Sequence, residues 1–325
     1  MSVDDFNWIR FAAELEGPGF AQFQVSLAKF NARCLEARLP GDDWRQELAE
    51  VSTVARAETE FIEALRCRIS PLVADIPRDV DGFIAWYEHL REIGPGQGDP
   101  LFPWLASHAT REQMKWFLYQ EVAGEAGFED LLAMTQVKIS EQAKLEMARN
   151  YWDEMGRGAA KGMHGPMLAR LADYFAVAPT PDTVVPEALA LGNTMIALAR
   201  HRRYAFHSIG ALGVIEMTAP TRAGYVNEGL RRLRVPAKKR HYFAVHAILD
   251  VKHSEAWNRE VLRPLVAEHP KCAPAIGEGA IMRLWHGARC FERYREEFKL
   301  TNTGDAADAA AASHSPQRQR DVALA

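Results

Sequence analysis

The sequence predicts an all-α protein built as a bundle of long helices. Apolar residues recur at three- and four-residue spacings along most of the chain, which is the period of an amphipathic helix. Short breaks rich in glycine and proline separate these segments. Alternating runs of β-branched residues, which would predict strands, are absent. With 325 residues, 48% of them hydrophobic and 25% charged, the chain has the composition of a globular protein with a large core.

The first half of the chain contains four well-marked helical segments. In the first of them, Leu48, Val51 and Val54 belong to the apolar face. The glycine- and proline-rich break at residues 94–100 ends the second. Thr110 begins the third, because its hydroxyl can accept a hydrogen bond from the amides of the first turn. The helices expected here cover residues 44–70, 78–92, 110–134 and 140–155.

The second half continues the same pattern. His164 begins a helix after a glycine-rich interruption, and Pro186 suits the first turn of the next because a proline lacks an amide hydrogen. We expect Pro220 to end that helix, since a proline inside a helix removes one backbone hydrogen bond. The helices expected here cover residues 164–175, 187–217, 222–233, 238–265 and 277–297.

These segments suggest three parts of the chain. Residues 1–97 are expected to form an N-terminal helical extension packed on the bundle. Residues 98–300 are expected to form the bundle itself, because long helices with short connections pack in this way. Residues 301–325 lack core-forming side chains and are predicted to be a disordered tail.

Composition and charge exclude several classes of function. The formal net charge is −4, and the basic residues between positions 231 and 240 are interpreted as a solvated helix end, so a nucleic-acid partner is not expected. No apolar run approaches the ~20 residues that span a bilayer. The four cysteines lie far apart, as in a reducing compartment. Because no basic and apolar leader is visible at the start, we expect a cytoplasmic protein without a membrane partner.

One predicted helix carries a group of residues suited to metal binding. His246, Asp250 and His253 are spaced i, i+4 and i+7, so they lie within about 60° of one another on one helix face. Two imidazoles and a carboxylate directed at one point are ligands for Fe(II), Mn(II) or Zn(II). The alternative is a polar stripe, or histidines hydrogen-bonded within a helical core.

Two further features add candidate ligands. Glu154 lies at the end of a predicted helix, where the helix dipole disfavours a carboxylate, and His164 follows ten residues later across the glycine-rich break. Glu216 is the one charged residue in an apolar stretch of twelve, so a buried carboxylate there needs a cation or a proton. Exposure to solvent is the alternative for the Glu154–His164 pair.

Together these residues provide three carboxylates and three histidines on four helical segments. Di-iron sites in helix bundles use this inventory of ligands. Glu121 and Glu125 share a helix face at i, i+4, and either could add a carboxylate or accept a hydrogen bond from a ligating histidine. A pair of surface carboxylates is the simpler interpretation of these two residues. The candidate metal ligands are therefore Glu154, His164, Glu216, His246, Asp250 and His253.

The same residues resemble the haem-oxygenase-like di-iron oxidases and oxygenases, also described as iron-containing redox enzymes. The resemblance begins near Asp99, includes Trp152–Gly156 with His164, and ends on His246-x3-Asp250-x2-His253. It implies a seven-helix fold like that of haem oxygenase, without haem and with extra N-terminal helices. It also implies that the six candidate residues bind two Fe(II), with Mn as a substitute.

The resemblance implies O2 as co-substrate and a small organic molecule as substrate. Relatives carry out N-oxygenation, oxidative decarboxylation to alkenes or fragmentation of amino acids, so the fold does not choose the reaction. An external electron donor and a homodimer are compatible with this expectation. Two alternatives remain open: a metal-independent, thiaminase-like or cofactorless enzyme on the same scaffold, and a non-enzymatic helical binding protein.

Overall fold

The computed structural model describes residues 8–124 and 127–300 and confirms the all-α prediction. Within these ranges it contains fourteen α-helices and no β-strand, apart from one isolated bridge. The tail expected at residues 301–325, and Glu125, lie outside the described residues. The helices are α1 (Trp8–Phe11), α2 (Gly17–Leu35), α3 (Trp44–Ile69), α4 (Val80–Ile93), α5 (Leu101–Ser107), α6 (Arg111–Gly124), α7 (Phe128–Thr135), α8 (Glu141–Glu154), α9 (His164–Phe175), α10 (Pro186–Arg200), α11 (Ala205–Arg232), α12 (His241–Trp257), α13 (Arg263–Glu268) and α14 (Ala273–Phe298).

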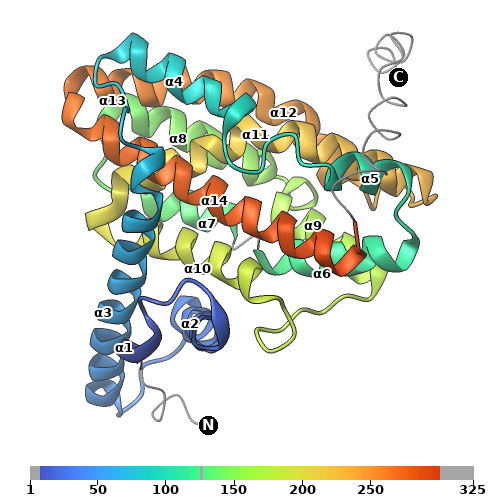
Figure 1. The fold of residues 1–325 in the computed structure, drawn as a ribbon, viewed down its shortest axis with the longest axis horizontal. Coiled ribbons are helices and arrows are strands. Elements are labelled where there is room, and N and C mark those ends of the chain that lie inside the picture. The colour runs from blue at the N-terminus through green and yellow to red at the C-terminus, as the bar shows by residue number, and fades with distance from the viewer. Residues whose placement is uncertain (1–7, 125–126, 301–325) are drawn as a thin grey trace.

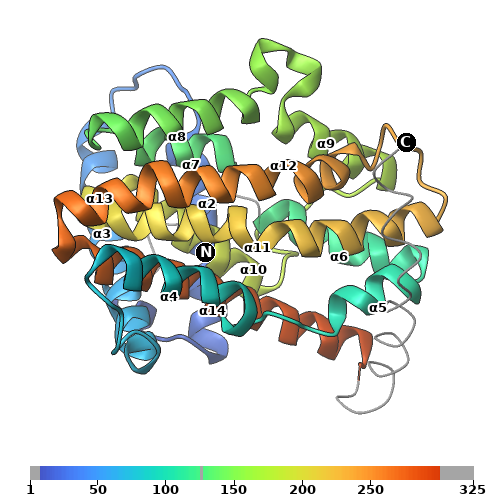
Figure 2. The same cartoon turned by 90° about the horizontal axis from the view of Figure 1, so that it is seen from above.

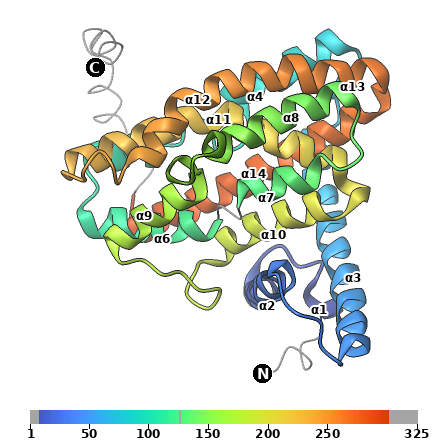
Figure 3. The ribbon, with the colours of Figure 1, turned by 180° about the vertical axis from the view of Figure 1, so that it is seen from behind.

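Helix α11 lies at the centre of the bundle. It makes its most extensive contacts with α12 on one side and α14 on the other, and α5 also packs against it. Seen from above, α8, α12, α11 and α14 run side by side along the long axis of the molecule (Figure 2). From behind, α9 crosses near α6, and α10 lies below α7 (Figure 3). Because α11 is enclosed by other helices, its side chains are buried on more than one face.

The contact between α11 and α14 depends on glycine. A Cβ atom added to Gly210 of α11 would lie 1.8 Å from the carbonyl oxygen of Ile276 in α14. A Cβ atom added to Gly279 of α14 would lie 1.9 Å from the carbonyl oxygen of His207 in α11. The two backbones therefore approach more closely than any other residue type would allow. This contact sets the position of α11 within the bundle.

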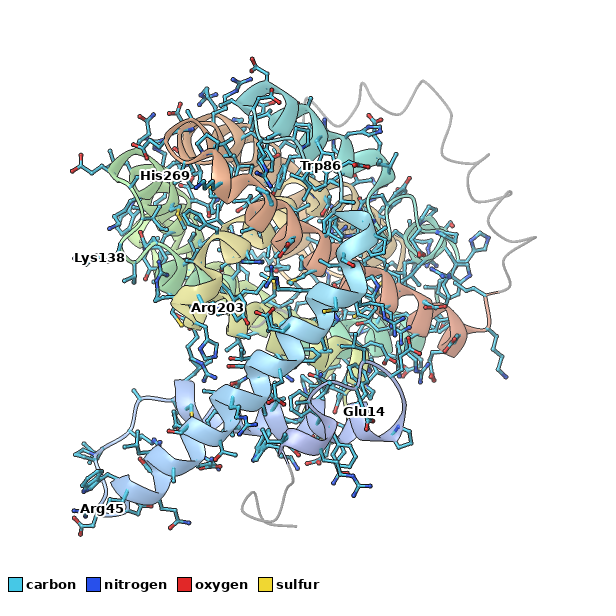
Figure 4. All side chains as sticks on the ribbon, turned by 60° about the vertical axis from the view of Figure 1, so that its left-hand side comes forward. Glu14, Arg45, Trp86, Lys138, Arg203 and His269 are labelled. Atoms are coloured by element: carbon cyan, nitrogen blue, oxygen red, sulfur yellow. The ribbon has the colours of Figure 1, made fainter. Side chains whose placement is uncertain are left out.

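The N-terminal helices pack at one end of the bundle. In Figure 1, α3 extends beyond the other helices, and Figure 4 shows Arg45 at its far end and Arg203 beside its middle. The side chain of Arg203 contacts Glu63 of α3 at 3.0 Å. The predicted apolar face is only partly buried, because Leu48 and Val51 are 57% and 43% exposed. This part of the prediction was wrong, since the first turns of α3 project beyond the bundle.

A partly buried ionic network joins α3 to the bundle. Arg66 of α3 and His207 of α11 both contact Glu278 of α14, at 2.7 and 2.9 Å. Burial disfavours the charge on Glu278, but hydrogen bonds from His207 and Arg66 outweigh it and lower the pKa of Glu278 to about 2. Helices α3, α11 and α14 therefore meet at one ionised carboxylate.

Several predicted helix boundaries were wrong. The expected helix 187–217 ends at Arg200, and after a short 3-10 turn α11 continues through Pro220. Pro220 costs one hydrogen bond to the carbonyl of Glu216, but packing of α11 against α5, α12 and α14 holds the helix together. The expected helices 110–134 and 238–265 are also interrupted, the second by a π-helical turn at Asn258–Leu262. None of the helices described is both long and apolar enough to cross a membrane.

The start of α6 follows the prediction closely. The side chain of Thr110 accepts a hydrogen bond from the amide of Gln113, at 3.3 Å. The side chain of Gln113 in turn accepts one from the amide of Thr110, at 2.9 Å. This reciprocal pair is a capping box, and it satisfies two amides that the first turn of the helix leaves unpaired.

Candidate metal centre

A tight turn brings Glu154 and His164 together. Helix α8 ends at Glu154, and α9 begins at His164. Between them the backbones of Met155 and Met163 form an isolated antiparallel bridge, so the chain folds back on itself within eight residues. Gly156 has a positive φ of 60°, and a Cβ atom there would lie 2.3 Å from the backbone of the returning segment. As a result, Glu154 Oε2 lies 2.6 Å from His164 Nδ1, and both side chains are buried.

The triad of α12 faces this pair. Asp250 is 2% exposed, and its two oxygens lie 3.0 and 3.1 Å from Nδ1 of His246. His253 Nδ1 lies 4.0 Å from Asp250 Oδ1. The ring of His246 also packs edge-on against that of His164, with centroids 4.6 Å apart. The i, i+4, i+7 spacing therefore places the three side chains together, as predicted.

Glu216 reaches the same point from α11. It is 2% exposed, and its Oε2 lies 3.3 Å from Nδ1 of His253. Its other oxygen accepts a hydrogen bond of 2.7 Å from the side-chain amide of the buried Asn150 in α8. The lone carboxylate in an apolar run is therefore buried and held in one orientation, directed at the histidine of α12.

The ligand atoms form two overlapping groups. Glu154, His164 and His246 form one, and Glu154, Glu216 and His253 form the other, with the offered atoms of each group within 4.8 Å of one another. Glu154 belongs to both groups. Asp250 lies outside both groups but contacts His246.

The distances within this cluster would suit ligands that share an ion. Two atoms bound at right angles with bonds of ~2.1 Å lie about 3 Å apart. The nitrogen–oxygen separations of 2.6 Å at His164 and 3.3 Å at His253 are close to this value. Both Nδ1 atoms are buried, and within residues 8–124 and 127–300 neither has a hydrogen-bond partner with suitable geometry. Buried polar atoms are normally hydrogen-bonded. Two buried imidazole nitrogens that lie beside carboxylates without a hydrogen bond therefore fit a metal site better than a purely hydrogen-bonded core.

The charges in the cluster are unbalanced without a cation. Burial, together with the neighbouring Asp250 and Glu154, raises the pKa of Glu216 to about 7, although His253 acts against this. Burial alone would lower the pKa of His253, but Glu216, Asp153 and Asp250 raise it to about 9. The carboxylates therefore attract positive charge at this point.

Asp153, which lies next to Glu154 and supports His253, was not among the residues predicted from the sequence. Oδ2 of Asp153 lies 3.2 Å from Nε2 of His253, while Nδ1 of that ring faces Glu216. Arg157 binds the other oxygen of Asp153 at 2.6 Å. Histidine ligands commonly donate their second nitrogen to a carboxylate, which fixes the ring. The spacing of Asp153 and Arg157, i and i+4 across the end of α8, was the available signal.

We expect Asp153→Asn to weaken iron binding by about 10- to 100-fold, because it weakens the support of the His253 ring. Titration of the metal-free protein with Fe(II) under anaerobic conditions, followed by metal analysis, measures this change. Arg157→Gln is the matched control, since the Arg157 side chain is 71% exposed and such pairs contribute little. Equal iron affinity in Asp153→Asn and wild type would show that Asp153 does not position His253.

A cavity of about 120 Å³ opens beside the cluster. Glu154, Glu216, His246 and Asp250 all line it. Glu121 lines it as well, so the interpretation of Glu121 as a surface residue was wrong. The rest of the wall is formed by apolar side chains, among them Phe102, Phe128, Leu131, Leu168, Leu191, Met195, Phe243 and Phe291.

Comparison with known proteins identifies the family. A family model described as iron-containing redox enzyme matches residues 115–288, which is more than half of the chain. The matched region extends from α6 into α14 and includes all six candidate ligands. A search of curated proteins finds no significant match. The chain therefore belongs to the family of iron-containing redox enzymes.

Proposed function

We propose that this protein is a non-haem di-iron oxidase or oxygenase that uses O2 to oxidise a small organic molecule. The observation that carries the proposal is the convergence of three imidazoles and three carboxylates, from α8, α9, α11 and α12, on one buried point beside a cavity. Glu154, which belongs to both ligand groups, would help to hold both ions. His164, His246 and Asp250 would complete the set of one ion, and Glu216 and His253 that of the other.

The residues of this chain would do three things in such a reaction. The six ligands hold two Fe(II), which would supply the electrons that activate O2. Asp153 and Asn150 fix the orientation of His253 and Glu216. The apolar wall of the cavity excludes water and leaves room for a substrate next to the ligands. Manganese is a substitute that the same ligand set accepts.

Metal analysis of the purified protein tests the proposal. We expect the protein loaded anaerobically with Fe(II) to hold two iron ions per chain. On exposure to O2 it should show a transient visible absorption band and consume O2. The variants His246→Ala and His253→Ala should lose iron and the band. If wild type and both variants contain no iron and show no band, the proposal fails.

The metal-independent alternative finds little support in the cavity. A thiaminase-like enzyme needs a nucleophilic cysteine, and Cys290 is the cysteine that lines the cavity. Burial, followed by the nearby Glu121, raises the pKa of Cys290 far above its usual range, so its thiol stays protonated. A non-enzymatic binding protein leaves the buried ligand cluster without a role. The small-molecule substrate belongs to our proposal, whereas an external electron donor, a homodimer and a cytoplasmic location stay predictions.

A further inference from the structure

The cavity has a second polar end, away from the metal ligands. One face of α11 lines it along its length, with Glu216, Ala219, Arg222, Ala223 and Val226 at spacings of three and four residues. The two alanines leave space between the charged residues. Glu216 and Arg222 are six residues apart, so they are separated by about 9 Å along the helix axis. The cavity therefore runs from a metal ligand to an arginine.

Arg222 lies in an unusual environment for a cation. Its guanidinium lies 5.6 Å from the centre of the Phe291 ring and 6.0 Å from that of Phe102. Its one hydrogen bond is to the hydroxyl of Thr218, at 3.2 Å. Among the residues that the structure describes, no carboxylate lies within ion-pair distance of it. A guanidinium has five donors, so the described residues use only a small part of its hydrogen-bonding capacity, and Arg222 lines the cavity.

The neighbouring charged residues do not balance the positive charge of Arg222. Arg283 of α14 lines the same end of the cavity and repels it, and Glu121 of α6 attracts it without forming an ion pair. Burial and Arg283 lower the pKa of Arg222 to about 9, against the effect of Glu121. A partly buried cation with incomplete pairing contributes little to the stability of the fold or lowers it. Such a group is typical of a binding site, where a ligand supplies the missing charge.

We propose that Arg222 binds the carboxylate of the substrate, which is an organic acid with an apolar body. The carboxylate would lie on the cavity side of the Phe102 and Phe291 rings, which pack edge-on with centroids 4.8 Å apart, and the planar guanidinium beside them can bind both of its oxygens. The apolar body would lie along Ala219 and Ala223 and direct a carbon several bonds away from the carboxylate to the metal ligands. This inference rests on the proposed function, because it assigns the substrate class of the same site.

Binding of matched probes to the full-length Fe(II) protein under anaerobic conditions tests the proposal. The probes are 3-phenylpropanoate and hexanoate, each compared with its primary amide by isothermal titration calorimetry. We expect each carboxylate to bind at least about 10-fold more tightly than its amide, because a charge-assisted hydrogen bond replaces a neutral one. Arg222→Met should weaken carboxylate binding by about 10- to 100-fold and leave amide binding unchanged. Arg231→Gln, an exposed arginine on the same helix, should change neither.

Thermal unfolding of the same variants separates a binding role from a structural one. If Arg222 exists to bind a ligand, Arg222→Met should unfold at the same temperature as wild type or at a higher one, because a partly buried and incompletely paired charge is removed. A lower unfolding temperature would assign Arg222 to the fold and overturn the proposal. Carboxylates that bind no more tightly than their amides, or not at all, would also overturn it.

The outcome is distinguishable from a failure of the di-iron proposal. The calorimetry is repeated on chelator-treated protein, where no iron can bind a carboxylate. Carboxylate binding that depends on Arg222 in this metal-free protein supports the inference even if O2 is never consumed. Conversely, a protein that holds two iron ions and consumes O2 but does not prefer carboxylates keeps its proposed function and loses this substrate class.

Discussion

Replacing Glu216 with glutamine is expected to reduce the iron content from two ions per chain to one or none and to lower O2 consumption at least about 100-fold. Glu216 is the carboxylate of α11 that faces His253, and no other residue of that helix belongs to the ligand groups. Glutamine keeps the size of the side chain and can still accept the hydrogen bond from Asn150. The loss of O2 consumption should exceed the 10- to 100-fold loss of activity or metal affinity that is typical of residues that only support a ligand. Iron analysis and an oxygen electrode measure both effects.

The same substitution should not lower the stability of the metal-free protein. In the metal-free protein, the Glu216 carboxylate is buried beside Asp250 and Glu154, which raises its pKa to about 7. Removing this charge relieves an unfavourable interaction, so metal-free Glu216→Gln should unfold at a temperature no lower than that of metal-free wild type. Wild type should gain stability when Fe(II) is added, and the variant should gain less.

Glu146→Gln is the matched control. Glu146 is also a buried carboxylate, but it pairs with Arg149 on α8 and belongs to neither ligand group. Its replacement should leave the iron content at the wild-type value. Full iron loading of Glu216→Gln would contradict the assignment of Glu216 as a ligand, whereas loss of iron in both variants would point to a general defect in folding.

Gly210→Ala is expected to destabilise the fold by at least about 3 kcal/mol. The added Cβ would lie 1.8 Å from the carbonyl oxygen of Ile276 and 2.7 Å from its carbon, so a backbone rather than a flexible side chain must move. Helices α11 and α14 would have to separate, which opens the core along their contact. Urea unfolding followed by circular dichroism measures the change. Because α11 carries Glu216, we also expect weaker iron binding.

Gly224→Ala on the same helix provides the comparison. No heavy atom lies within 4 Å of a Cβ added at Gly224, and the residue lies inside α11. Alanine is a better helix former than glycine, so this variant should gain about 0.5–1 kcal/mol. If both variants have the same stability, the close approach at Gly210 does not limit the fold.

Much of the metal centre could be predicted from local spacing. Positions i, i+4 and i+7 share a helix face whatever the rest of the chain does, so His246, Asp250 and His253 had to lie together. Likewise, a single carboxylate within an apolar helix becomes buried when that helix packs in the core. Glu216 is such a carboxylate, and it is buried. The glycines between Glu154 and His164 indicated a sharp turn, although the sequence did not show the backbone bridge that closes it.

Other features were beyond the reach of the sequence. Asp153 supports His253 across 100 positions of the chain, and no local pattern relates two such residues. The helix break at His201 and the passage of α11 through Pro220 went against local propensity, because packing on several sides outweighs one lost hydrogen bond. Leu48 and Val51 have helical spacing, but in the described part of the chain they remain 57% and 43% exposed.

The sequence by itself determined the all-α class, most of the helices and the inventory of six candidate ligands, because helical periodicity and buried charge are local properties. Only the tertiary structure decided how those ligands are grouped, with Glu154 shared between two sets, and that the cavity beside them ends at Arg222. The physical reason is that the rotation and separation of neighbouring helices depend on the contacts between them, such as the glycine contact of α11 with α14. Those contacts join residues that are distant in sequence, and they place the ligands of four helical segments around one point.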